Sequence, residues 1–372
     1  MAPPIYQTST YAQDGVGRPR RGYEYARSQN PTRERLERAV ARLEGGTHGI
    51  AFASGSAATA AIADLAVPGD EIVVGDDVYG GTYRYLERVH RPHGIDARYI
   101  DLASGQDALW EALSERTRLV WFESPTNPLL KVVDIAASAA VVRERAAAGG
   151  ARPLVVVDNT FASPAIQQPL ALGADIVFHS ATKYLAGHSD TILGIVVTAD
   201  DAVAERLRFL QNAMGGVPGP LDCFLVLRGL RTLHLRVERS SASAAAIATF
   251  LAGRPDVAGV SYPGLGDAPG RSLVGTQMRL GGGMVSVLPA PGGRHDRTPA
   301  ERAIALAERT RLFTLAESLG GVESLIEIPA AMTHMSVAGS PLEVDPALVR
   351  LSVGIEGVDD LIADLHQALD EA

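Results

Sequence analysis

The feature that most constrains the fold of this chain is the alternation of short apolar runs with helical stretches along its N-terminal half. Several of the runs, such as 154–157, are apolar throughout, which is typical of strands covered on both faces. Strands that alternate with helices form right-handed crossover units around a mainly parallel sheet. We therefore predict an α/β fold with strands at 49–53, 71–75, 97–101, 118–122, 154–158, 175–179 and 193–197.

The pattern changes at both ends of this α/β region. The first 30 residues are rich in Pro, Gly and Tyr and show no sustained period. Two long helical stretches, around 227–253 and 298–312, flank a strand-like run at 283–288. The length of the chain also suggests about two domains. We therefore expect three parts: an extended arm at 1–30, a large domain at 31–225, and a smaller α+β domain at 226–372; the resemblance described below implies that the arm contacts a neighbouring subunit.

Composition and charge argue against several classes of protein. The net charge of −9, from 34 Lys and Arg against 43 Asp and Glu, argues against nucleic acid as the main partner. No apolar run is long enough to span a membrane, and no secretory signal or zinc-type Cys/His cluster is visible, so we expect no membrane contact and no metal. The single Cys223 fits a cytoplasmic location and is expected to be buried.

Lysine is almost absent from the chain. Only Lys131 and Lys183 are present, so the other 32 of the 34 basic residues are Arg. Because Arg neither loses its proton in a protein nor forms an imine, a remaining Lys is a candidate reactive amine. Lys183 follows Ser180 and Thr182 at the end of a buried strand, where hydroxyl groups suit a phosphate. Lys131 follows a Pro turn and is expected at an exposed or rim position.

Polar residues also follow other predicted strands, at the edge where parallel sheets bind ligands. One strand ends in Asp158, a second runs into a Gly-flanked loop with Tyr79, and a third opens a helix at Gly55 and Ser56. Each of these three features also has an ordinary structural interpretation. For Asp158 it is a turn cap, for Tyr79 it is surface packing, and for Gly55 and Ser56 it is a tight strand–helix connection. Together with Lys183 they offer an amine, a phosphate cradle, an aromatic face and a carboxylate. Pyridoxal 5'-phosphate (PLP) needs each of these groups.

Long blocks of the chain, from about residue 3 to the C-terminus, carry a recognisable pattern. They lie at 23–33, 52–59, 77–82, 123–128, 157–161, 180–184, 187–190, 312–321 and 350–354. These blocks closely resemble the Cys/Met-metabolism family of PLP-dependent enzymes, the cystathionine γ-lyase and γ-synthase group. The resemblance implies a fold-type I PLP-dependent transferase fold and a homotetramer built from two active dimers.

The resemblance implies a role for each cofactor-binding residue. Lys183 would form the Schiff base with the cofactor and then act as the base. Asp158 would pair with the pyridinium nitrogen, and Tyr79 would stack on the ring and take part in proton transfer. The phosphate would be held by residues of the same chain and of the neighbouring subunit: Gly55, Ser56, Ser180 and Thr182, with Tyr25 and Arg27 from the neighbour.

The resemblance also implies how a substrate binds. Arg350, helped by Asn127 and Ser318, would bind the α-carboxylate, a task that suits a planar guanidinium. Glu24 and Glu317 stand where relatives carry acidic residues for the distal ammonium of cystathionine. Without the resemblance, ordinary loop charge and a helix cap are the preferred interpretations of these two residues.

The resemblance implies γ-elimination on L-cystathionine, which gives cysteine, 2-oxobutanoate and ammonia. A cystathionine γ-synthase, or a related γ-replacement on an O-acylhomoserine, is the alternative because the synthases share most motifs. Gly81 stands where methionine γ-lyases carry a Cys, which argues against that activity. A non-catalytic PLP-binding regulatory protein is a further alternative, against which the set of Lys183, Asp158, Tyr79 and Arg350 argues.

Overall fold

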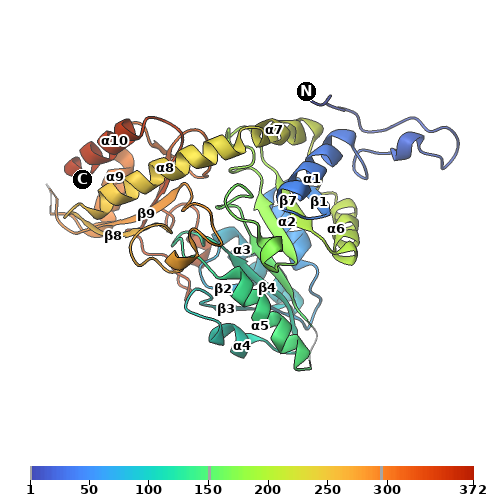
Figure 1. The fold of residues 1–372 in the computed structure, drawn as a ribbon, viewed down its shortest axis with the longest axis horizontal. Coiled ribbons are helices and arrows are strands. Elements are labelled where there is room, and N and C mark those ends of the chain that lie inside the picture. Colours follow the sequence, from blue (N-terminus) through green and yellow to red (C-terminus); the bar gives the residue numbers. More distant parts are fainter. Residues whose placement is uncertain (1, 150–151, 294–295) are drawn as a thin grey trace.

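Two β-sheets organise the chain in the computed structural model, which describes residues 2–149, 152–293 and 296–372 (Figure 1). The larger sheet has the strand order β1-β7-β6-β5-β4-β2-β3. Its strands are β1 His48–Phe52, β2 Glu71–Gly75, β3 Asp96–Ile100, β4 Thr117–Glu123, β5 Leu154–Asp158, β6 Ile176–Ser180 and β7 Gly194–Thr198. Each predicted strand is present, with its ends within one residue of the expected ones.

All strands of the larger sheet except β7 run in the same direction. Parallel pairing joins β3, β2, β4, β5 and β6 in turn, and β7 runs antiparallel to both β6 and β1. The prediction of a mainly parallel sheet is therefore confirmed. Because parallel strands share one direction, their carboxyl ends meet at the same edge of the sheet.

Helices cover both faces of the larger sheet. They are α1 Pro31–Leu43, α2 Gly55–Ala63, α3 Gly80–Tyr85, α4 Asp107–Ala112, α5 Ile135–Ala147, α6 Asp201–Met214 and α7 Pro220–Leu230. On one face, apolar residues of α2 and α6 pack on Trp121 and Phe178. On the other face, α4 and α5 pack on Phe122 and Val157, and α1 and α7 pack near Val177. This arrangement explains why the strands are apolar on both sides.

The C-terminal region contains the smaller sheet, with the order β10-β11-β12-β9-β8. Its strands are β8 Val257–Ser261, β9 Met284–Pro289, β10 Thr314–Leu315, β11 Leu325–Glu327 and β12 Val349–Ser352. The helices α8 Leu233–Ala252, α9 Pro299–Arg309 and α10 Val358–Glu371 supply Ile247, Leu306 and Leu365 to its core. The α+β character expected of this region is present.

The helical stretch expected at 227–253 is two helices, α7 and α8, and the proposed domain boundary after residue 225 falls inside α7. The interruption lies at Arg231 and Thr232. The Arg236 side chain donates hydrogen bonds to the carbonyl oxygens of Gly229 (2.9 Å) and Tyr184 (2.8 Å), and so satisfies the end of α7 from outside the helix. The side chain of Arg236 in α8 thus bonds to a carbonyl oxygen at the end of α7 and also to the segment after β6.

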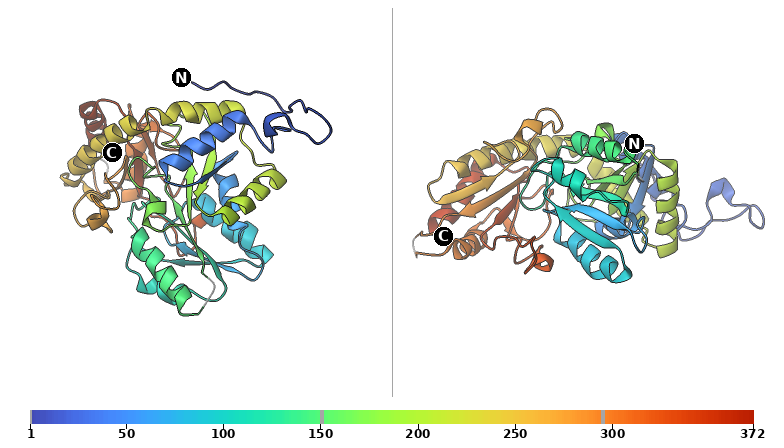
Figure 2. Two further views of the ribbon diagram at one scale, coloured as in Figure 1. Left: turned by 45° about the vertical axis from the view of Figure 1, so that its right-hand side comes forward. Right: turned by 90° about the horizontal axis from the view of Figure 1, so that it is seen from below.

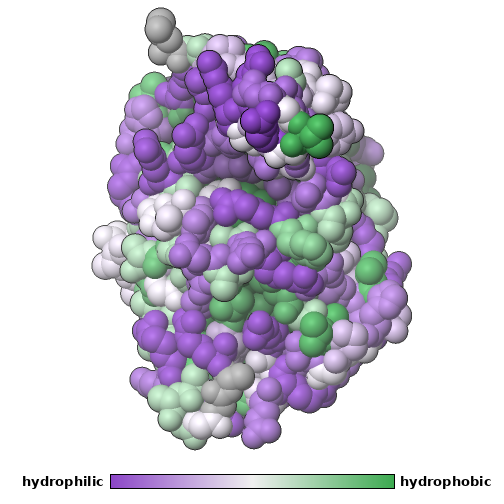
Figure 3. Space-filling view, turned by 90° about the vertical axis from the view of Figure 1, so that its right-hand side faces the viewer, coloured by the Kyte–Doolittle hydropathy of each residue, from purple (hydrophilic) through white to green (hydrophobic). Residues whose placement is uncertain are grey.

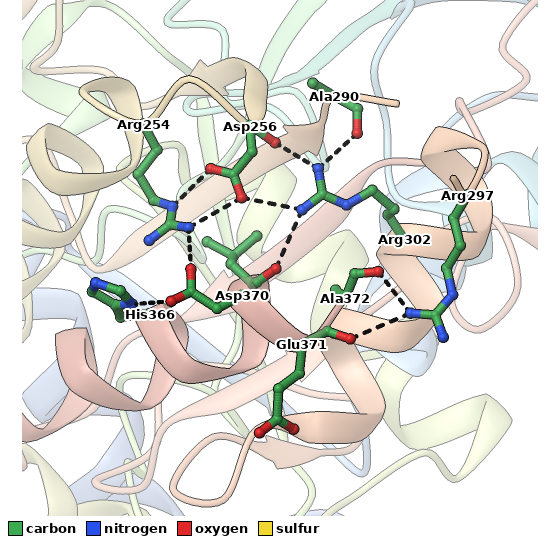
Figure 4. Close-up of polar contacts among 10 residues, drawn as sticks. Arg254, Asp256, Ala290, Arg297, Arg302, His366, Asp370, Glu371 and Ala372 are labelled. Carbon is green, nitrogen blue, oxygen red and sulfur yellow. Dashed lines mark hydrogen bonds and ion pairs between the residues drawn. The ribbon is translucent and has the colours of Figure 1, made fainter. Parts of the chain in front are cut away.

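A cluster of charged residues fastens α10 to the smaller sheet (Figure 4). Arg302, only 1% exposed, donates to the carbonyl oxygens of Asp256 and Ala290 and pairs with the Asp256 carboxylate at 3.1 Å. The same guanidinium reaches the carbonyl oxygen of Leu369 in α10 at 3.3 Å. Arg254 joins the Asp256 and Asp370 carboxylates. These contacts fix the C-terminal helix against the strands beneath it.

The arm before α1 extends away from the rest of the molecule (Figures 1 and 2). It contains one short 3₁₀ turn, Arg20–Gly22, and folds back on itself through an isolated bridge between Thr10 and Tyr25. Asn30 ends the arm and caps α1, because its Oδ1 accepts hydrogen bonds from the backbone of Thr32 and Arg33. Within the described ranges, none of the helices has the length and apolar character that a membrane crossing requires.

Candidate active site

A cavity of about 1100 Å³ opens between the two sheets, at the carboxyl ends of strands of the larger one. Its walls include residues from the ends of β1, β4, β5 and β6 and from the smaller sheet. The structure brings together here Gly55, Ser56, Tyr79, Asn127, Asp158, Ser180, Thr182, Lys183, Glu317, Ser318 and Arg350. The cavity therefore contains all of the predicted site residues except Glu24, Tyr25 and Arg27.

Lys183 presents its amine to the cavity from the turn after β6. Its Nζ donates a hydrogen bond to the Oγ of Ser318 at 2.7 Å. Burial lowers the pKa of Lys183 to about 8, and the positive charge of Arg350 acts in the same direction. Ser318 has a backbone φ of 97°, a conformation that a non-glycine residue adopts only when its surroundings hold it there. The amine is thus both oriented and easy to deprotonate.

Two buried carboxyl groups stand side by side at the sheet edge. Glu123 ends β4 and Asp158 ends β5, and the two residues are partners in the strand register. The backbone N–H of Thr160 donates to Asp158 Oδ1 at 2.8 Å, and that of Tyr79 donates to Glu123 Oε1 at 2.7 Å. Burial raises the pKa of both carboxyl groups, and the charge of Asp158 raises that of Glu123 further. Glu123 is not among the residues predicted for the site, although it ends a strand as Asp158 does.

The helix α2 begins at the cavity, so its first backbone N–H groups point toward the space in front of Ser180. Ser54 caps this helix by accepting from the N–H of Ala57. A Cβ at Gly55 would lie 3.2 Å from the Cβ and Oγ of Ser180, so the absence of a side chain here avoids a tight contact with Ser180. The hydroxyl of Thr182 already bonds to the backbone of Leu193, at 3.0 Å to its nitrogen.

Tyr79 stands at the start of α3, with its ring partly exposed in the cavity wall. The ring lies edge-on to His334, with 6.2 Å between centroids. A Cβ at Gly81 would come within 2.4 Å of the Tyr79 ring. Burial raises the pKa of the Tyr79 phenol. The missing side chain at Gly81 therefore lets the ring occupy its present position.

Arg350 is the buried cation of the cavity. Its guanidinium donates to Asn127 Oδ1 at 2.9 Å and to the carbonyl oxygen of Ser318 at 3.1 Å. It also pairs at 2.9 Å with Glu327, which faces it across the β11–β12 register, and both side chains are 2% exposed. Thr333 donates a hydrogen bond to the same Glu327 oxygen. Glu327 could not be predicted from the sequence because β11 has three residues and carries no recognisable period.

Three predicted residues lie outside this cavity, on the arm. Tyr25 is 47% exposed, and the Arg27 guanidinium lies 5.7 Å from the centre of its ring. Arg27 also donates to the carbonyl oxygen of Asn212 at 3.0 Å. Glu24 offers its backbone oxygen to Tyr11. Whether these side chains reach a neighbouring subunit stays a prediction.

The expectation of an exposed or rim position for Lys131 is wrong. Its side chain is 13% exposed, and Nζ lies 2.9 Å from Asp76 and 3.3 Å from Asp101. Asp76 and Asp101 directly follow the neighbouring parallel strands β2 and β3, so their carboxylates lie close together. Both form ion pairs with the Lys131 ammonium, which holds this side chain against the protein. Cys223, in contrast, is fully buried as expected, and burial raises the pKa of its thiol to about 12.

The residues of the cavity fit PLP. A buried amine with a lowered pKa, a buried carboxyl group, a helix N-terminus kept open at Gly55 and an aromatic ring all face one space of sufficient size. Among the described residues no group of three His, Cys, Asp or Glu side chains is arranged to hold a metal ion. The fold and the cavity together define a PLP-dependent enzyme of fold type I.

The chain belongs to the Cys/Met metabolism PLP-dependent enzyme family, whose model matches residues 1–370. It is 53% identical to a cystathionine γ-synthase of Mycobacterium tuberculosis, over 98% of this chain and 91% of the relative. It is 50% identical to a cystathionine β-lyase of Coxiella burnetii, over 98% and 92%. The crystal structure of cystathionine γ-lyase from yeast superposes with a TM-score of 0.90 at 48% identity, over 100% and 93%. The enzyme therefore acts within a group that forms or cleaves carbon–sulfur bonds.

Proposed function

We propose that this enzyme catalyses γ-elimination on L-cystathionine, giving cysteine, 2-oxobutanoate and ammonia. The observation that carries the proposal is that Glu317 lines the same cavity as Arg350 and Lys183. Cystathionine has an amino-acid group at each end. Arg350 offers a site for one carboxylate, and the carboxylate of Glu317 offers a site for the distal ammonium.

The proposed cofactor site uses the residues on the larger sheet. When bound, PLP withdraws electrons from the substrate Cα, which makes the Cα proton acidic. Asp158 would pair with the ring nitrogen, and Tyr79 would stack on the ring. The phosphate would be held by the start of α2 and the turn after β6, that is by Gly55, Ser56, Ser180 and Thr182.

Lys183 is the proposed base. With a pKa of about 8, its amine is partly neutral near physiological pH, and in that form it removes the Cα proton. Ser318 holds the amine at 2.7 Å, on the side of the cavity where Arg350 anchors the carboxylate. Asn127 accepts a hydrogen bond from the other terminal nitrogen of the Arg350 guanidinium. A γ-reaction also requires the loss of a proton from Cβ, and the Lys183 amine is the proposed base for that step too.

A γ-synthase is the second candidate, supported by the 53% identity to the mycobacterial γ-synthase. In that reaction cysteine sulfur adds at Cγ as the acyloxy group of an O-acylhomoserine leaves. The same residues serve both reactions, and they differ in the group that enters or leaves at Cγ. Because one relative is named a cystathionine β-lyase, the experiment described next also has to detect β-elimination.

Incubation of the PLP-loaded enzyme with L-cystathionine alone distinguishes these activities. Release of 2-oxobutanoate with cysteine supports the γ-lyase. Release of pyruvate with homocysteine instead would contradict it and assign a β-lyase. If cystathionine is inert, but an O-acylhomoserine with cysteine yields cystathionine, the γ-synthase replaces the proposal.

The proposed assembly is a cytoplasmic homotetramer of two active dimers. Support comes from the arm, which carries Tyr25 and Arg27 outside the cavity of their own chain. The face of the molecule on the side of the arm is mainly hydrophilic with hydrophobic residues between (Figure 3). Exposed apolar side chains include Val16 on the arm and Phe209 and Met214 on α6. A second chain would cover such residues.

A further inference from the structure

The segment 333–336 joins the region of the smaller sheet to the start of α3. It follows β11 and packs against α3, the helix that begins directly after Tyr79. The Oγ of Ser336 donates a hydrogen bond to the carbonyl oxygen of Gly80 at 2.6 Å. A Cβ at Gly80 would lie 2.6 Å from the carbonyl oxygen of Thr333, so a larger residue there would push the two segments apart. The segment therefore fits closely against the backbone that carries the Tyr79 ring.

His334 is the buried member of this segment, with 2% of the residue exposed. It contacts three residues that line the cavity, namely Tyr79, Asn127 and Thr333. Burial lowers the pKa of His334 to about 4, and the positive charge of Arg350 acts in the same direction. The imidazole is therefore neutral at about pH 7, where one of its nitrogens donates a hydrogen bond and the other accepts one.

The two imidazole nitrogens reach the Arg350 guanidinium by separate routes. Nε2 lies 3.2 Å from the carbonyl oxygen of Asn127, which can only accept, so Nε2 carries the proton. The side chain of the same Asn127 accepts from Arg350 at 2.9 Å. Nδ1 lies 2.9 Å from the hydroxyl oxygen of Thr333, which lies 2.8 Å from Glu327 Oε1. This hydroxyl offers one proton to the two acceptors, and the Glu327 oxygen pairs with Arg350 at 2.9 Å.

The imidazole ring itself packs against Tyr79. The two ring planes stand at 86°, with 6.2 Å between their centroids. This edge-to-face arrangement is one that aromatic rings favour. Because the Tyr79 ring is partly exposed in the cavity wall, the imidazole is one of the groups that limit its position on the protein side. One side chain thus contacts both the candidate stacking ring and the supports of the candidate carboxylate anchor.

We propose that His334 is a positioning residue that fixes Arg350 and the ring of Tyr79 relative to each other. The proposal rests on the roles given above to Arg350 and Tyr79. A phenylalanine would offer the ring alone, and a glutamine would offer hydrogen bonds alone. An imidazole supplies a flat ring together with a donor and an acceptor. The ring contact and the hydrogen bonds can therefore be separated by substitution.

Two measurements on the PLP-loaded enzyme report the two contacts. L-Alanine has an α-carboxylate but no group on Cβ that can leave. Its dissociation constant, from a titration followed by the absorbance of bound PLP, therefore reports the carboxylate anchor. The circular dichroism of bound PLP depends on the asymmetric arrangement of groups around the cofactor, so it reports the position of the Tyr79 ring.

His334→Phe keeps a ring against Tyr79 but loses both hydrogen bonds. The dissociation constant of L-alanine should rise about tenfold, while the circular dichroism of bound PLP stays as in wild type. His334→Gln keeps a donor for the carbonyl oxygen of Asn127 but loses the ring. Here the circular dichroism band should lose intensity, while the dissociation constant stays within about twofold of wild type.

Thr333→Val removes one of the two routes without touching the imidazole. It should raise the dissociation constant of L-alanine about fivefold and leave the circular dichroism unchanged. This variant decides the anchor half of the proposal if His334→Phe does not fold, because a wild-type dissociation constant in Thr333→Val would then overturn it.

His366 on α10 is the matched control. It also stacks on an aromatic ring, Phe250, with 6.1 Å between centroids, and also bonds to a polar partner, Asp370, at 3.0 Å. His366→Phe and His366→Gln should change neither measurement. An unchanged dissociation constant in His334→Phe, or unchanged circular dichroism in His334→Gln, would overturn the proposal. Equal effects of both His334 variants on both measurements would also overturn it, since a purely structural role predicts that result.

The test does not depend on the sulfur substrate. If cystathionine is inert, the proposed function fails while the L-alanine titration still decides this inference. If Arg350→Gln binds L-alanine as tightly as wild type, the anchor assigned in the proposed function is wrong, and the inference falls with it. Weaker binding in Arg350→Gln, with wild-type measurements in both His334 variants, would contradict the inference alone.

Discussion

The amine of Lys183 and the hydroxyl of Ser318 lie 2.7 Å apart, although 135 positions separate them in the chain. Lys183 follows β6 of the larger sheet, and Ser318 lies between β10 and β11 of the smaller one. Arg350, on β12, binds the carbonyl oxygen of the same Ser318. The candidate base and the candidate carboxylate anchor therefore meet at one residue, and they do so only when both sheets are in place.

Replacing Lys183 by Arg should abolish turnover, with a loss of about 10³-fold or more, because Arg keeps the charge but neither forms an imine nor acts as a base. Steady-state assays and the absorbance of bound PLP measure the effect. The matched control is Lys131→Arg, which keeps a cation near Asp76 and Asp101 and should retain turnover within about twofold. Normal turnover in Lys183→Arg would contradict the assignment of the base.

The two lysines should also differ in their effect on the stability of apo-protein. The folded pKa of Lys183 is lowered to about 8, so between about pH 8 and about pH 10.5 the unfolded chain binds a proton that the folded chain does not, and stability rises with pH. Lys183→Met should therefore raise the free energy of unfolding by about 3 kcal/mol at pH 7. This gain should disappear above about pH 10.5.

Lys131→Met is the control for that experiment. Its carboxylate partners raise the pKa of Lys131, so the pair stabilises the fold, and removing the amine should lower the free energy of unfolding by about 2 kcal/mol at pH 7. Urea titrations of apo-protein at the two pH values measure both effects. Equal destabilisation of Lys183→Met and Lys131→Met would contradict the predicted difference between the two lysines.

Adding a methyl group at Gly81 should displace the Tyr79 ring. The new Cβ would lie 2.4 Å from a ring carbon, while the ring itself can move toward the cavity. Gly81→Ala should therefore lower kcat by about tenfold to a hundredfold with little loss of stability. Gly259→Ala, where the nearest atom is 3.8 Å away, serves as the control. Unchanged kcat in Gly81→Ala would show that the position of the ring does not matter.

Neutralising Glu317 should weaken binding of a substrate with a distal ammonium. If cystathionine is the substrate, Glu317→Gln should raise KM by about tenfold with a smaller effect on kcat. The exposed Glu308 of α9 provides a control at which the same change should have no effect. An unchanged KM would mean that another group receives the ammonium.

Mixed dimers test whether active sites are shared. Arg27→Ala and Lys183→Ala chains should each be inactive alone. In a mixed dimer, the intact Lys183 of one chain meets the intact arm of the other, so about half of the wild-type turnover per dimer should return. Co-expression with two affinity tags isolates this species. If it is inactive, Arg27 acts only within its own chain.

The strands of the larger sheet could be predicted from the sequence because each has a recognisable apolar run. Strands such as β5, Leu154–Asp158, are apolar on both faces, and polar residues follow where they end. The position of Asp158 and Lys183 at one edge then follows from parallel pairing alone. The short strands β10 and β11, with two and three residues, carry no such signal.

Charge partners were the main information that the sequence did not contain. Glu327 pairs with Arg350, Glu44 with His179 and Lys131 with Asp76, and each pair joins segments that meet only in the folded chain. Local context suggested an exposed or rim position for Lys131 for this reason. Arg236, next to the interruption between α7 and α8, likewise bonds to the distant carbonyl oxygen of Tyr184, a contact that the sequence does not reveal.

The pairing of Arg350 with Glu327 has a consequence for substrate binding. A guanidinium free in solution must shed its water before it binds a carboxylate. Arg350 is already 2% exposed and held by Glu327, Asn127 and Ser318, so its dehydration occurs once, when the chain folds. An amino-acid substrate therefore binds a guanidinium that is already dehydrated and oriented, and the water released on binding comes mainly from the substrate.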